Sequence, residues 1–365
     1  MFPGLKIGRY SVPFPLIQGG MGVRISGGRL AGHVARCGGV GIIASAGLGL
    51  DTPIFDGRNF FEADAKALKE ELKKAYAIAP EGIIGVNCMM AVTDYEENVL
   101  SACEGGAKII ISGAGLPLSL PRLTEHYPDV ALVPIVSSVK AIELIVRKWQ
   151  KNYNRFPDAV VVEDPETAGG HLGSHLENIG TGCYDQYATV RGVKSYLRQA
   201  SGRDIPVIAA GGIWDQGDIL HAFEEGADGV QMASRFVCTE ECDADAAYKQ
   251  AYLDCTREQI GLIMSPVGLP GRAILKNVEA IEGYDKERGF ICPCRCLKRC
   301  AYREDGEHFC IVHSLDRAQR GDTETGLIFC GSNAWKADRI TTVEEIFHEL
   351  FAAFAEEQCL KVENG

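Results

Sequence analysis

Four cysteines in one short stretch have the spacing of an iron site. Cys292, Cys296 and Cys300 follow one another at intervals of four residues, and Cys310 comes ten residues later. Three close cysteines can converge on one point while the fourth completes the cage, and four thiolates are the usual ligands of a [4Fe–4S] cluster. Structural zinc also takes four cysteines, usually as two pairs set well apart. We therefore expect a [4Fe–4S] cluster, with zinc and unliganded thiols as the alternatives.

Other cysteines leave the choice of ligands open. Cys294 lies inside the same run, where we expect its side chain to point elsewhere, and Cys330 is a more distant alternative ligand. The chain has 14 cysteines, and five of them fall between Cys292 and Cys310. Most of the others lie in apolar runs, as Cys88 does, and we expect those to pack in the core.

A histidine in a glycine-rich loop is the residue best suited to proton transfer. His171 lies among Gly169, Gly170 and Gly173. A neutral imidazole can take up a proton near pH 7 and return it. The alternative is a structural hydrogen bond within the loop, and His175 is the main competitor for the catalytic role. We expect His171 to be catalytic.

The elements that must position these residues are predicted from eight short apolar runs that alternate with helix-forming segments. The runs are rich in Val and Ile, which is typical of parallel strands buried on both faces. They cover residues 15–20, 39–45, 82–89, 107–113, 131–137, 159–164, 205–212 and 229–236. The clearest helices are expected over 62–78, 138–150 and 215–225, with Ser138 as an N-cap. This alternation predicts a (β/α)8 TIM barrel of the α/β class, with a doubly wound open sheet as the structural alternative.

The alternation stops after the eighth strand, which divides the chain into three parts. Residues 1–237 are predicted to form the barrel, 238–335 a Cys-rich insertion without a sustained period, and 336–365 the final barrel helix and tail. An amphipathic helix is expected over 341–358, with a threonine as its cap and a glutamate completing a capping box. The insertion is predicted to be the iron–sulfur subdomain because it contains the clustered cysteines.

The predicted strand ends carry glycines where side chains would crowd a flat ligand. Residues 19–22, 113–115 and 210–212 are such ends, and ligands of a barrel bind at the carboxyl ends of its strands. The N–H groups at the ends of the seventh and eighth predicted strands, residues 210–212 and 232–234, could cradle a phosphate together with the Ser234 hydroxyl. Tight turns explain any single glycine, whereas the whole set favours a ligand. Because neither a GxGxxG nor a P-loop sequence occurs, a Rossmann or P-loop nucleotide site has no support.

Six segments in order resemble a known flavoprotein family. They are PLIQGGMG (15–22), GVN (85–87), SGAGLP (112–117), EDPETAGGHLG (163–173), IPVIAAGGI (205–213) and GADGVQMASRF (226–236). With them the chain resembles the nitronate monooxygenase and 2-nitropropane dioxygenase-like proteins, which include FMN-dependent enoyl-ACP reductases. A narrower resemblance, through IPVIAAGGIWD, ECDA, SPVGLPGRAI and the Cys-rich insertion, is to bacterial decanoyl-ACP dehydrogenases/isomerases that carry an iron–sulfur cluster.

The resemblance implies an FMN-binding TIM barrel in which His171 is the active-site histidine. It implies that FMN is held by residues at the strand ends, some near the ring and others near the phosphate. The ring-side residues are Gly20, Met21, Gly22 and Asn87, the phosphate-side residues are Gly211, Gly212, Ala233 and Ser234, and Glu163, Gly170 and Met232 complete the expected set. Glu163 is expected to hydrogen-bond the flavin or to orient the loop, and as a buried carboxylate it would need a partner.

The leading interpretation is an FMN- and [4Fe–4S]-dependent dehydrogenase/isomerase of acyl-ACP or acyl-CoA, such as decanoyl-ACP, in unsaturated fatty acid synthesis. Desaturation needs a base for the α-proton and a hydride acceptor for Cβ, which is the task of the flavin. The alternatives are nitronate monooxygenase, NAD(P)H-dependent enoyl-ACP reductase and an electron-transfer or redox-sensing protein that keeps the barrel as a scaffold. The strand-end glycines and His171 count against the last, and the cysteines count against simple nitronate oxidation.

Charge and hydropathy argue against two kinds of partner. The net charge of −12 disfavours nucleic acid, which needs a basic face, although an acidic average can hide a basic patch for an acidic carrier protein. No run of 18 apolar residues occurs and the start lacks an apolar signal segment, so we expect no membrane association. These features predict a cytoplasmic enzyme, and the resemblance adds the expectation of a homodimer.

Overall fold

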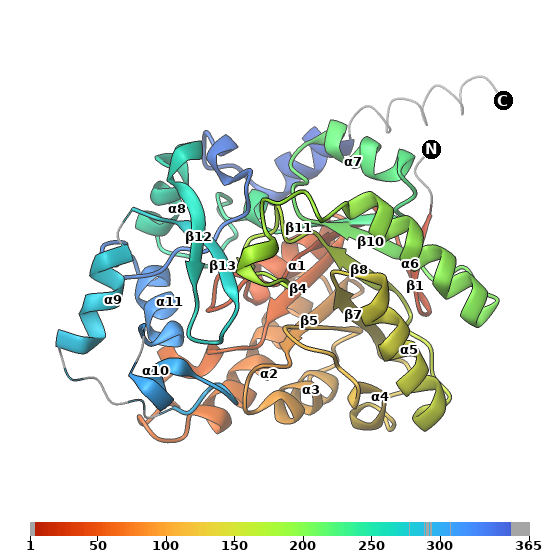
Figure 1. Ribbon diagram of the computed structural model, residues 1–365. Helices are drawn as coiled ribbons and strands as arrows, with labels where there is room; N and C mark the ends of the chain where they lie inside the picture. The colour runs from red at the N-terminus through yellow and green to blue at the C-terminus, as the bar shows by residue number, and fades with distance from the viewer. Residues whose placement is uncertain are drawn as a thin grey trace.

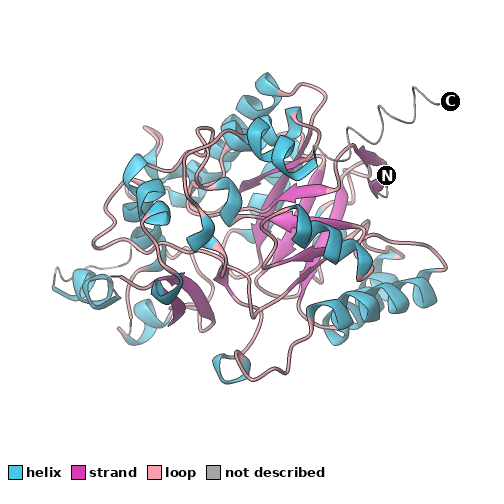
Figure 2. Ribbon diagram, turned by 90° about the horizontal axis from the view of Figure 1, so that it is seen from above, coloured by secondary structure: helices cyan, strands magenta, loops and turns pink. Residues whose placement is uncertain are grey.

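The computed structural model describes residues 4–351 apart from positions 277, 288, 290, 291, 293 and 307. Eight parallel strands form its centre, and Figure 2 shows them gathered among the surrounding helices. They are β3 (Leu16–Gln18), β4 (Val40–Ala44), β5 (Ile83–Met89), β6 (Ile109–Gly113), β7 (Ala131–Val136), β8 (Val160–Glu163), β10 (Val207–Ala210) and β11 (Gly229–Met232). They close in the order β10-β11-β3-β4-β5-β6-β7-β8. The predicted barrel and its eight strands are confirmed, and the open-sheet alternative is wrong.

The inside of the barrel is a packed core. Because strand side chains alternate between the two faces, every second residue points inward. The inward residues are mostly β-branched and form one buried cluster, which includes Ile17, Val40, Ile42, Ile109, Ile111, Val133, Val161 and Ile208. This layer fills the middle of the barrel and leaves space for a ligand only beyond the carboxyl ends of the strands.

A small hairpin closes the opposite end of the barrel. Its strands β1 (Leu5–Ile7) and β2 (Tyr10–Val12) pair antiparallel. Leu5 and Ile7 are buried in the same cluster as the barrel interior. Three-residue strands carry too little periodicity to be predicted, and the sequence did not indicate this hairpin.

The helices follow the strands as expected. They are α1 (Gly28–Arg36), α2 (Phe60–Ile78), α3 (Tyr95–Glu104), α4 (Leu120–Leu123), α5 (Val139–Tyr153), α6 (Gln186–Ser201) and α7 (Gln216–Glu224). The helices predicted over 62–78, 138–150 and 215–225 are confirmed as α2, α5 and α7, and the Ser138 hydroxyl accepts from Ala141 N–H at the start of α5. In the described part of the chain, every helix is too short or too polar to cross a bilayer.

The last predicted helix begins as expected. Residues 343–351 are helical, and residues 352–358 of the prediction lie outside the described residues. Thr342 and Glu345 form the predicted capping box: the Glu345 N–H donates to the Thr342 hydroxyl at 3.1 Å, and the Thr342 N–H donates to the Glu345 carboxylate at 3.2 Å.

The insertion contains more regular structure than its sequence indicates. Besides short 3-10 turns, its described residues form a hairpin and four short helices, which lie to one side of the barrel in Figure 1. They are α8 (Ala246–Leu253), β12 (Ile260–Met264), β13 (Pro270–Ile274), α9 (Val278–Glu287), α10 (Ala301–Asp305) and α11 (Ile311–Gln319). No element exceeds ten residues, which is why no sustained period was visible.

The insertion packs on the carboxyl ends of the barrel strands. The segment after β5 bridges to it through Val92 and Leu297. The Gly331 N–H donates to the Ser234 hydroxyl after β11 at 2.8 Å. The two-residue strand β9 (Gly170–His171), which follows β8, pairs with β13. The insertion therefore covers the end of the barrel at which ligands bind.

Candidate active site

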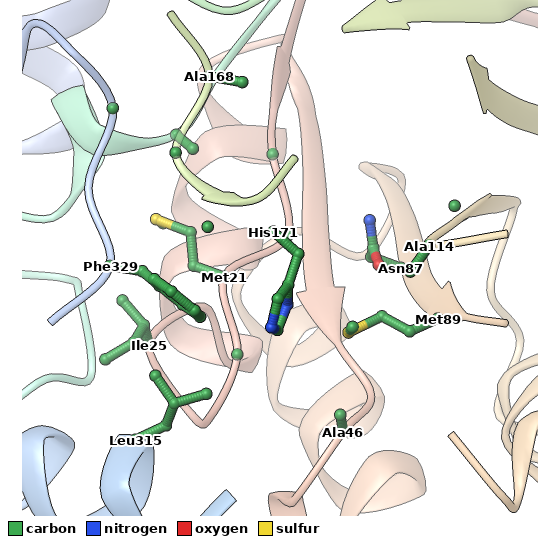
Figure 3. A pocket seen from close by; sticks show the side chains of 18 of the residues that line it. Met21, Ile25, Ala46, Asn87, Met89, Ala114, Ala168, His171, Leu315 and Phe329 are labelled. Atoms are coloured by element: carbon green, nitrogen blue, oxygen red, sulfur yellow. The ribbon is translucent and has the colours of Figure 1, made fainter. Parts of the chain in front are cut away.

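A cavity of about 260 Å³ lies where the barrel strands meet the insertion. Its wall contains His171 and every residue predicted to bind the cofactor: Gly20, Met21, Gly22, Asn87, Glu163, Gly170, Gly211, Gly212, Met232, Ala233 and Ser234. The insertion contributes apolar side chains to the wall, among them Leu315 and Phe329. Figure 3 shows the His171 ring pointing into the space that these side chains surround. The structure thus brings the predicted residues together in one place.

Three of the cavity glycines are required by the protein itself. A Cβ on Gly20 would lie 2.5 Å from the Asn87 Cβ. Gly211 and Gly212 have φ values of +99° and +72°, and a Cβ on either would press on Thr167. Gly22 differs, since the nearest atom to its Cβ would be the Ala46 carbonyl oxygen at 4.0 Å. Contacts and backbone conformation within the chain therefore explain the first three glycines, whereas no close contact explains Gly22.

His171 is held by the insertion and is neutral at physiological pH. It lies in β9, opposite Gly271 of β13. Its Nε2 is 2.7 Å from the Ser265 hydroxyl oxygen, and its ring meets Phe329 edge to face at a centroid distance of 5.0 Å. Burial lowers the pKa of His171 to about 4, because a charged imidazolium is poorly solvated there. The competitor His175 is exposed and does not line the cavity.

Glu163 ends β8 and lines the same cavity. Burial raises its pKa to about 7, and the neighbouring Asp164 carboxylate adds to this effect. No cation contributes to the shift. Glu163 therefore lacks the charged partner that we expected, and its raised pKa favours the protonated carboxyl instead, since a neutral group avoids burying an unpaired charge.

Sequence reasoning missed several polar side chains of the cavity wall, and two of them, Gln231 and Asp94, have an oxygen without a hydrogen-bond partner among the described residues. Gln231 is 9% exposed and lines the cavity, and its Oε1 has no hydrogen-bond partner among the described residues. Asp94 is equally buried, and its Oδ2 has no partner either. Gln231 could have been predicted to line the site, because it is a polar residue inside the otherwise apolar strand GVQM. Buried acceptors without donors are costly, so these atoms await donors from a ligand or from water.

The four predicted iron ligands gather beside this cavity. Cys296 lies in the cavity wall. Burial raises the pKa of the Cys310 thiol to about 12, with further contributions from Cys292 and Cys300 beside it. Burial and the same neighbouring thiols raise the pKa of Cys296 as well. The structure therefore places Cys292, Cys296, Cys300 and Cys310 near one another, although no three of the described His, Cys, Asp or Glu side chains are close enough to hold a single metal ion.

The two alternative cysteines lie differently. Cys294 is buried and close enough to act on the pKa of Cys296, so it lies near the group. Cys330 lines the cavity, and the groups that act on its pKa are Cys255 and Arg272 rather than the clustered thiols. These neighbours set Cys330 apart from the clustered thiols.

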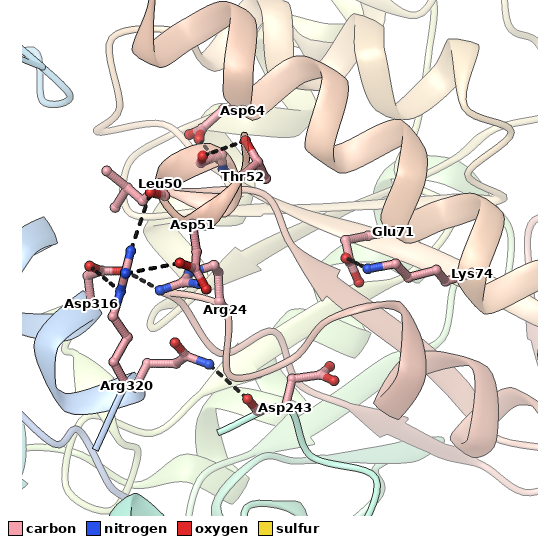
Figure 4. A network of polar contacts seen from close by, with 12 residues as sticks. Arg24, Leu50, Asp51, Thr52, Asp64, Glu71, Lys74, Asp243, Asp316 and Arg320 are labelled. Carbon is pink, nitrogen blue, oxygen red and sulfur yellow. Dashed lines mark hydrogen bonds and ion pairs between the residues drawn. The ribbon is translucent and has the colours of Figure 1, made fainter. Parts of the chain in front are cut away.

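An ion-pair network joins the loop after β3 to α11, the helix that starts after Cys310 (Figure 4). Arg24 pairs with Asp316 of α11 and, at 2.8 Å, with Asp51. Arg320 pairs with the same two carboxylates at 3.0 and 2.9 Å. Ion pairs therefore connect the loop that contains Met21 to the helix that follows Cys310.

Comparisons with known proteins agree with this geometry. A family model described as nitronate monooxygenase matches residues 5–353. A (3aS,4S,5R,7aS)-5-hydroxy-7a-methyl-1-oxo-octahydro-1H-indene-4-carboxyl-CoA dehydrogenase of Mycobacterium tuberculosis is 28% identical over 287 residues, which are 78% of this chain and 70% of that protein. A nitronate monooxygenase of Pseudomonas aeruginosa is 38% identical over 117 residues, 32% of this chain and 31% of that protein.

Two solved structures share the fold. FabK from Thermotoga maritima has a TM-score of 0.69 at 24% identity, and the match covers 97% of this chain and 96% of that one. A nitroalkane oxidase from Streptomyces ansochromogenes has a TM-score of 0.68 at 22% identity, with 95% and 97% covered. At these identities the likeness is one of architecture alone.

Proposed function

This chain belongs to the nitronate monooxygenase family of FMN-dependent oxidoreductases, and from that premise we propose that it is a dehydrogenase/isomerase of acyl thioesters that carries a [4Fe–4S] cluster. The observation that carries the proposal is the position of the cysteine group, whose Cys296 shares a cavity with His171. Nitronate oxidation and enoyl reduction by NAD(P)H need no metal centre beside the flavin. The relative from Mycobacterium tuberculosis, whose name is that of a carboxyl-CoA dehydrogenase, supports a thioester substrate.

The cavity fits FMN. Gln231 offers a buried acceptor without a donor, which matches the N–H of the flavin ring or a hydroxyl of the ribityl chain. At the ends of β10 and β11, Gly211 and Gly212 turn in the left-handed region and Ser234 adds a hydroxyl, an arrangement suited to a phosphate. Gly22 leaves open space next to Met21, where the ring is expected to lie.

The cysteine group fits a [4Fe–4S] cluster as its donor set. Cys296, Cys300 and Cys310 are buried, and the His313 N–H at the start of α11 donates to the Cys310 sulfur, which favours a thiolate there. Among the described residues, no three His, Cys, Asp or Glu side chains are grouped closely enough to hold a single metal ion. Each thiolate of a cluster binds a different iron, so the sulfurs stand farther apart than around one zinc ion.

The chain's own residues account for the proton transfers. When bound, FMN would supply the acceptor for the hydride that leaves Cβ. His171, neutral at pH 7, takes the proton from Cα, so that a double bond forms between the two carbons. Moving that bond from C2–C3 to C3–C4 takes a proton from C4 and returns one to C2, which one histidine can serve. Ile25, Leu315 and Phe329 line the cavity with apolar surface suited to an alkyl chain.

The test starts with anaerobic purification, a visible spectrum and an assay of iron and sulfide. We expect about four irons and four sulfides per chain and bleaching of the flavin by decanoyl-ACP or decanoyl-CoA. Serine variants of Cys292, Cys296, Cys300 and Cys310 should each lose iron. The matched control Cys330→Ser should keep it, because its neighbours are Cys255 and Arg272.

Other outcomes would move the assignment within the family. A flavin without iron that is reduced by a nitronate and not by the thioester would make the protein a nitronate monooxygenase. Reduction by NAD(P)H followed by transfer to an enoyl thioester would make it an enoyl reductase. Iron that survives all four serine substitutions would contradict the proposed ligands.

A further inference from the structure

The hairpin of the insertion brings a buried serine to the predicted catalytic histidine. Strands β12 and β13 pair from Ile260 with Ile274 up to Met264 with Pro270, and residues 265–269 form the turn. The Ser265 N–H donates to the Leu269 carbonyl at 3.0 Å, which fixes the start of this turn. β13 in turn pairs with β9 through Gly271 and His171. Both partners therefore lie on one small sheet, and their separation is set by its register.

The contacts of the His171 ring divide its two nitrogens between different tasks. Nε2 is 2.7 Å from the Ser265 Oγ, and Ser265 is completely buried. Phe329 covers one side of the ring. No described residue is a hydrogen-bond partner of Nδ1, which leaves this nitrogen for a ligand in the cavity.

We infer that Ser265 is the positioning residue of His171: its hydroxyl oxygen accepts the Nε2–H and thereby presents the Nδ1 lone pair to the substrate as the base. This inference rests on the proposed function, which supplies the proton that Nδ1 removes. When Nδ1 takes the α-proton, the ring becomes an imidazolium whose Nε2–H bond to Oγ is charge-assisted and stronger. Ser265 thus stabilises the protonated ring at the moment when it forms.

Burial makes such support necessary. A histidine whose pKa is lowered to about 4 is a weak base, and burial is the cause of that shift. The other titratable groups of the cavity wall and of β13 are Glu163, Asp64, Asp94, Tyr248, Tyr252, Cys296, Cys330 and Arg272. None of them contributes to the shift of His171, and Arg272 is engaged with the carbonyl oxygens of Pro165 and Ala168. The Ser265 hydroxyl, 2.7 Å from Nε2, is the described group in position to favour the protonated ring.

The experiment compares Ser265→Ala with Ser265→Thr in the holoenzyme. We expect Ser265→Ala to lower kcat by about 10- to 100-fold with little change in KM, because the imidazolium loses a charge-assisted hydrogen bond. The acid limb of the pH profile of kcat/KM should move to lower pH, since the His171 pKa falls further. Ser265→Thr keeps the hydroxyl and should restore most of kcat. Exchange of the α-proton in deuterated water reports the same step without flavin reduction.

Two controls separate this role from loss of structure. Ser112 is as buried as Ser265, and its hydroxyl contacts the Tyr95 hydroxyl at 2.9 Å and the Cys88 carbonyl oxygen at 3.1 Å rather than His171. Ser112→Ala should therefore lower the free energy of unfolding about as much as Ser265→Ala does, without moving the acid limb of the pH profile of kcat/KM. In a sample with ¹⁵N-labelled histidine, the ring-nitrogen signals of His171 should change in Ser265→Ala and stay in Ser112→Ala.

The outcomes distinguish the inference from the function on which it rests. If wild-type protein neither exchanges the α-proton nor bleaches its flavin with the thioester, the proposed function fails, and the nitrogen signals still report whether Ser265 holds Nε2. Ser265→Ala with unchanged kcat, pH limb and His171 signals would overturn the inference.

Discussion

At the scale of single residues, Gly20 and Gly22 lie close together, but the reasons for the absence of a side chain differ between the two positions. Any side chain on Gly20 would collide with Asn87, so the fold itself excludes one. Around Gly22 the nearest atom to an added Cβ is 4.0 Å away, so the fold tolerates one. No side-chain contact requires glycine at this second position, and a ligand that lies against the backbone would require it.

Alanine substitutions should therefore separate the two reasons. Gly20→Ala should lower the free energy of unfolding of the apoprotein by about 1–3 kcal/mol, because overpacked side chains must shift. Gly22→Ala should leave that stability within about 0.5 kcal/mol of wild type and still raise the Kd for FMN at least about tenfold, as it adds a methyl group to the cavity wall. Urea unfolding and a fluorescence titration with FMN measure the two effects. Unchanged FMN affinity in Gly22→Ala would place the flavin elsewhere.

At the scale of elements, the loop after β3 and α11 depend on each other through charge. Arg24 and Asp316 are largely buried, with 12% and 10% of their side chains exposed, so neither can be solvated well without the other. Asp51 and Arg320 complete the network at the surface. Removing one partner of such a pair lowers the free energy of unfolding by more than the pair adds to it, because the remaining charge stays buried without a partner.

Asp316→Asn should loosen this connection. We expect a loss of about 1–3 kcal/mol in the free energy of unfolding and a lower iron content after anaerobic dialysis, because α11 adjoins Cys310. The matched control is Asp129→Asn, which breaks an ion pair at the surface. The side chains of Arg9 and Asp129 in that pair are 62% and 69% exposed. That change should cost less than about 0.5 kcal/mol and leave iron in place. Equal effects of the two variants would contradict the role given to the network.

At the scale of the whole molecule, burial raises the pKa of several acids, two of them in the cavity wall and one outside it. Burial raises the pKa of Glu163 and of Asp64 to about 7 and that of Asp243 to about 6. A folded state that holds protons which the unfolded chain releases loses stability as the pH rises. His171 acts in the opposite direction below its ordinary pKa, because its neutral form is the one that the fold favours.

Glu163→Gln isolates one of these acids in the apoprotein. The folded pKa of about 7 lies above the ordinary value of 4.5, so the stability that the proton provides is complete at low pH and is lost between these two values. The glutamine variant should therefore gain about 1–2 kcal/mol relative to wild type on going from about pH 5 to pH 8, a figure reduced from the full shift because water can enter the cavity. Urea unfolding at several pH values measures it. A difference that does not change with pH would show that Glu163 ionises normally.

Several features of the site could be predicted without the structure. Parallel strands buried on both faces must be nearly continuous apolar runs, so the eight strands of the barrel were visible in the sequence. Their order places residues 19–22, 210–212 and 232–234 at one end, which is why the residues predicted to bind the cofactor and His171 are found around one cavity. The spacing of Cys292, Cys296 and Cys300 likewise predicted their proximity, because it is a local feature.

Only the tertiary structure decided which residues of the insertion serve the site. Ser265 meets His171 across 94 residues of sequence, and such a contact leaves no periodic or local signal. The inward orientation of Gln231 depends on the register of β11 against its neighbours. The pKa shifts of His171 and Glu163 arise from burial beneath an insertion whose short elements are not visible as a pattern. The sequence by itself determined the barrel and its ligand-binding end, since these follow from apolar periodicity. Packing between distant segments determined the protonation states and the hydrogen-bond partners, since these depend on which surfaces exclude water.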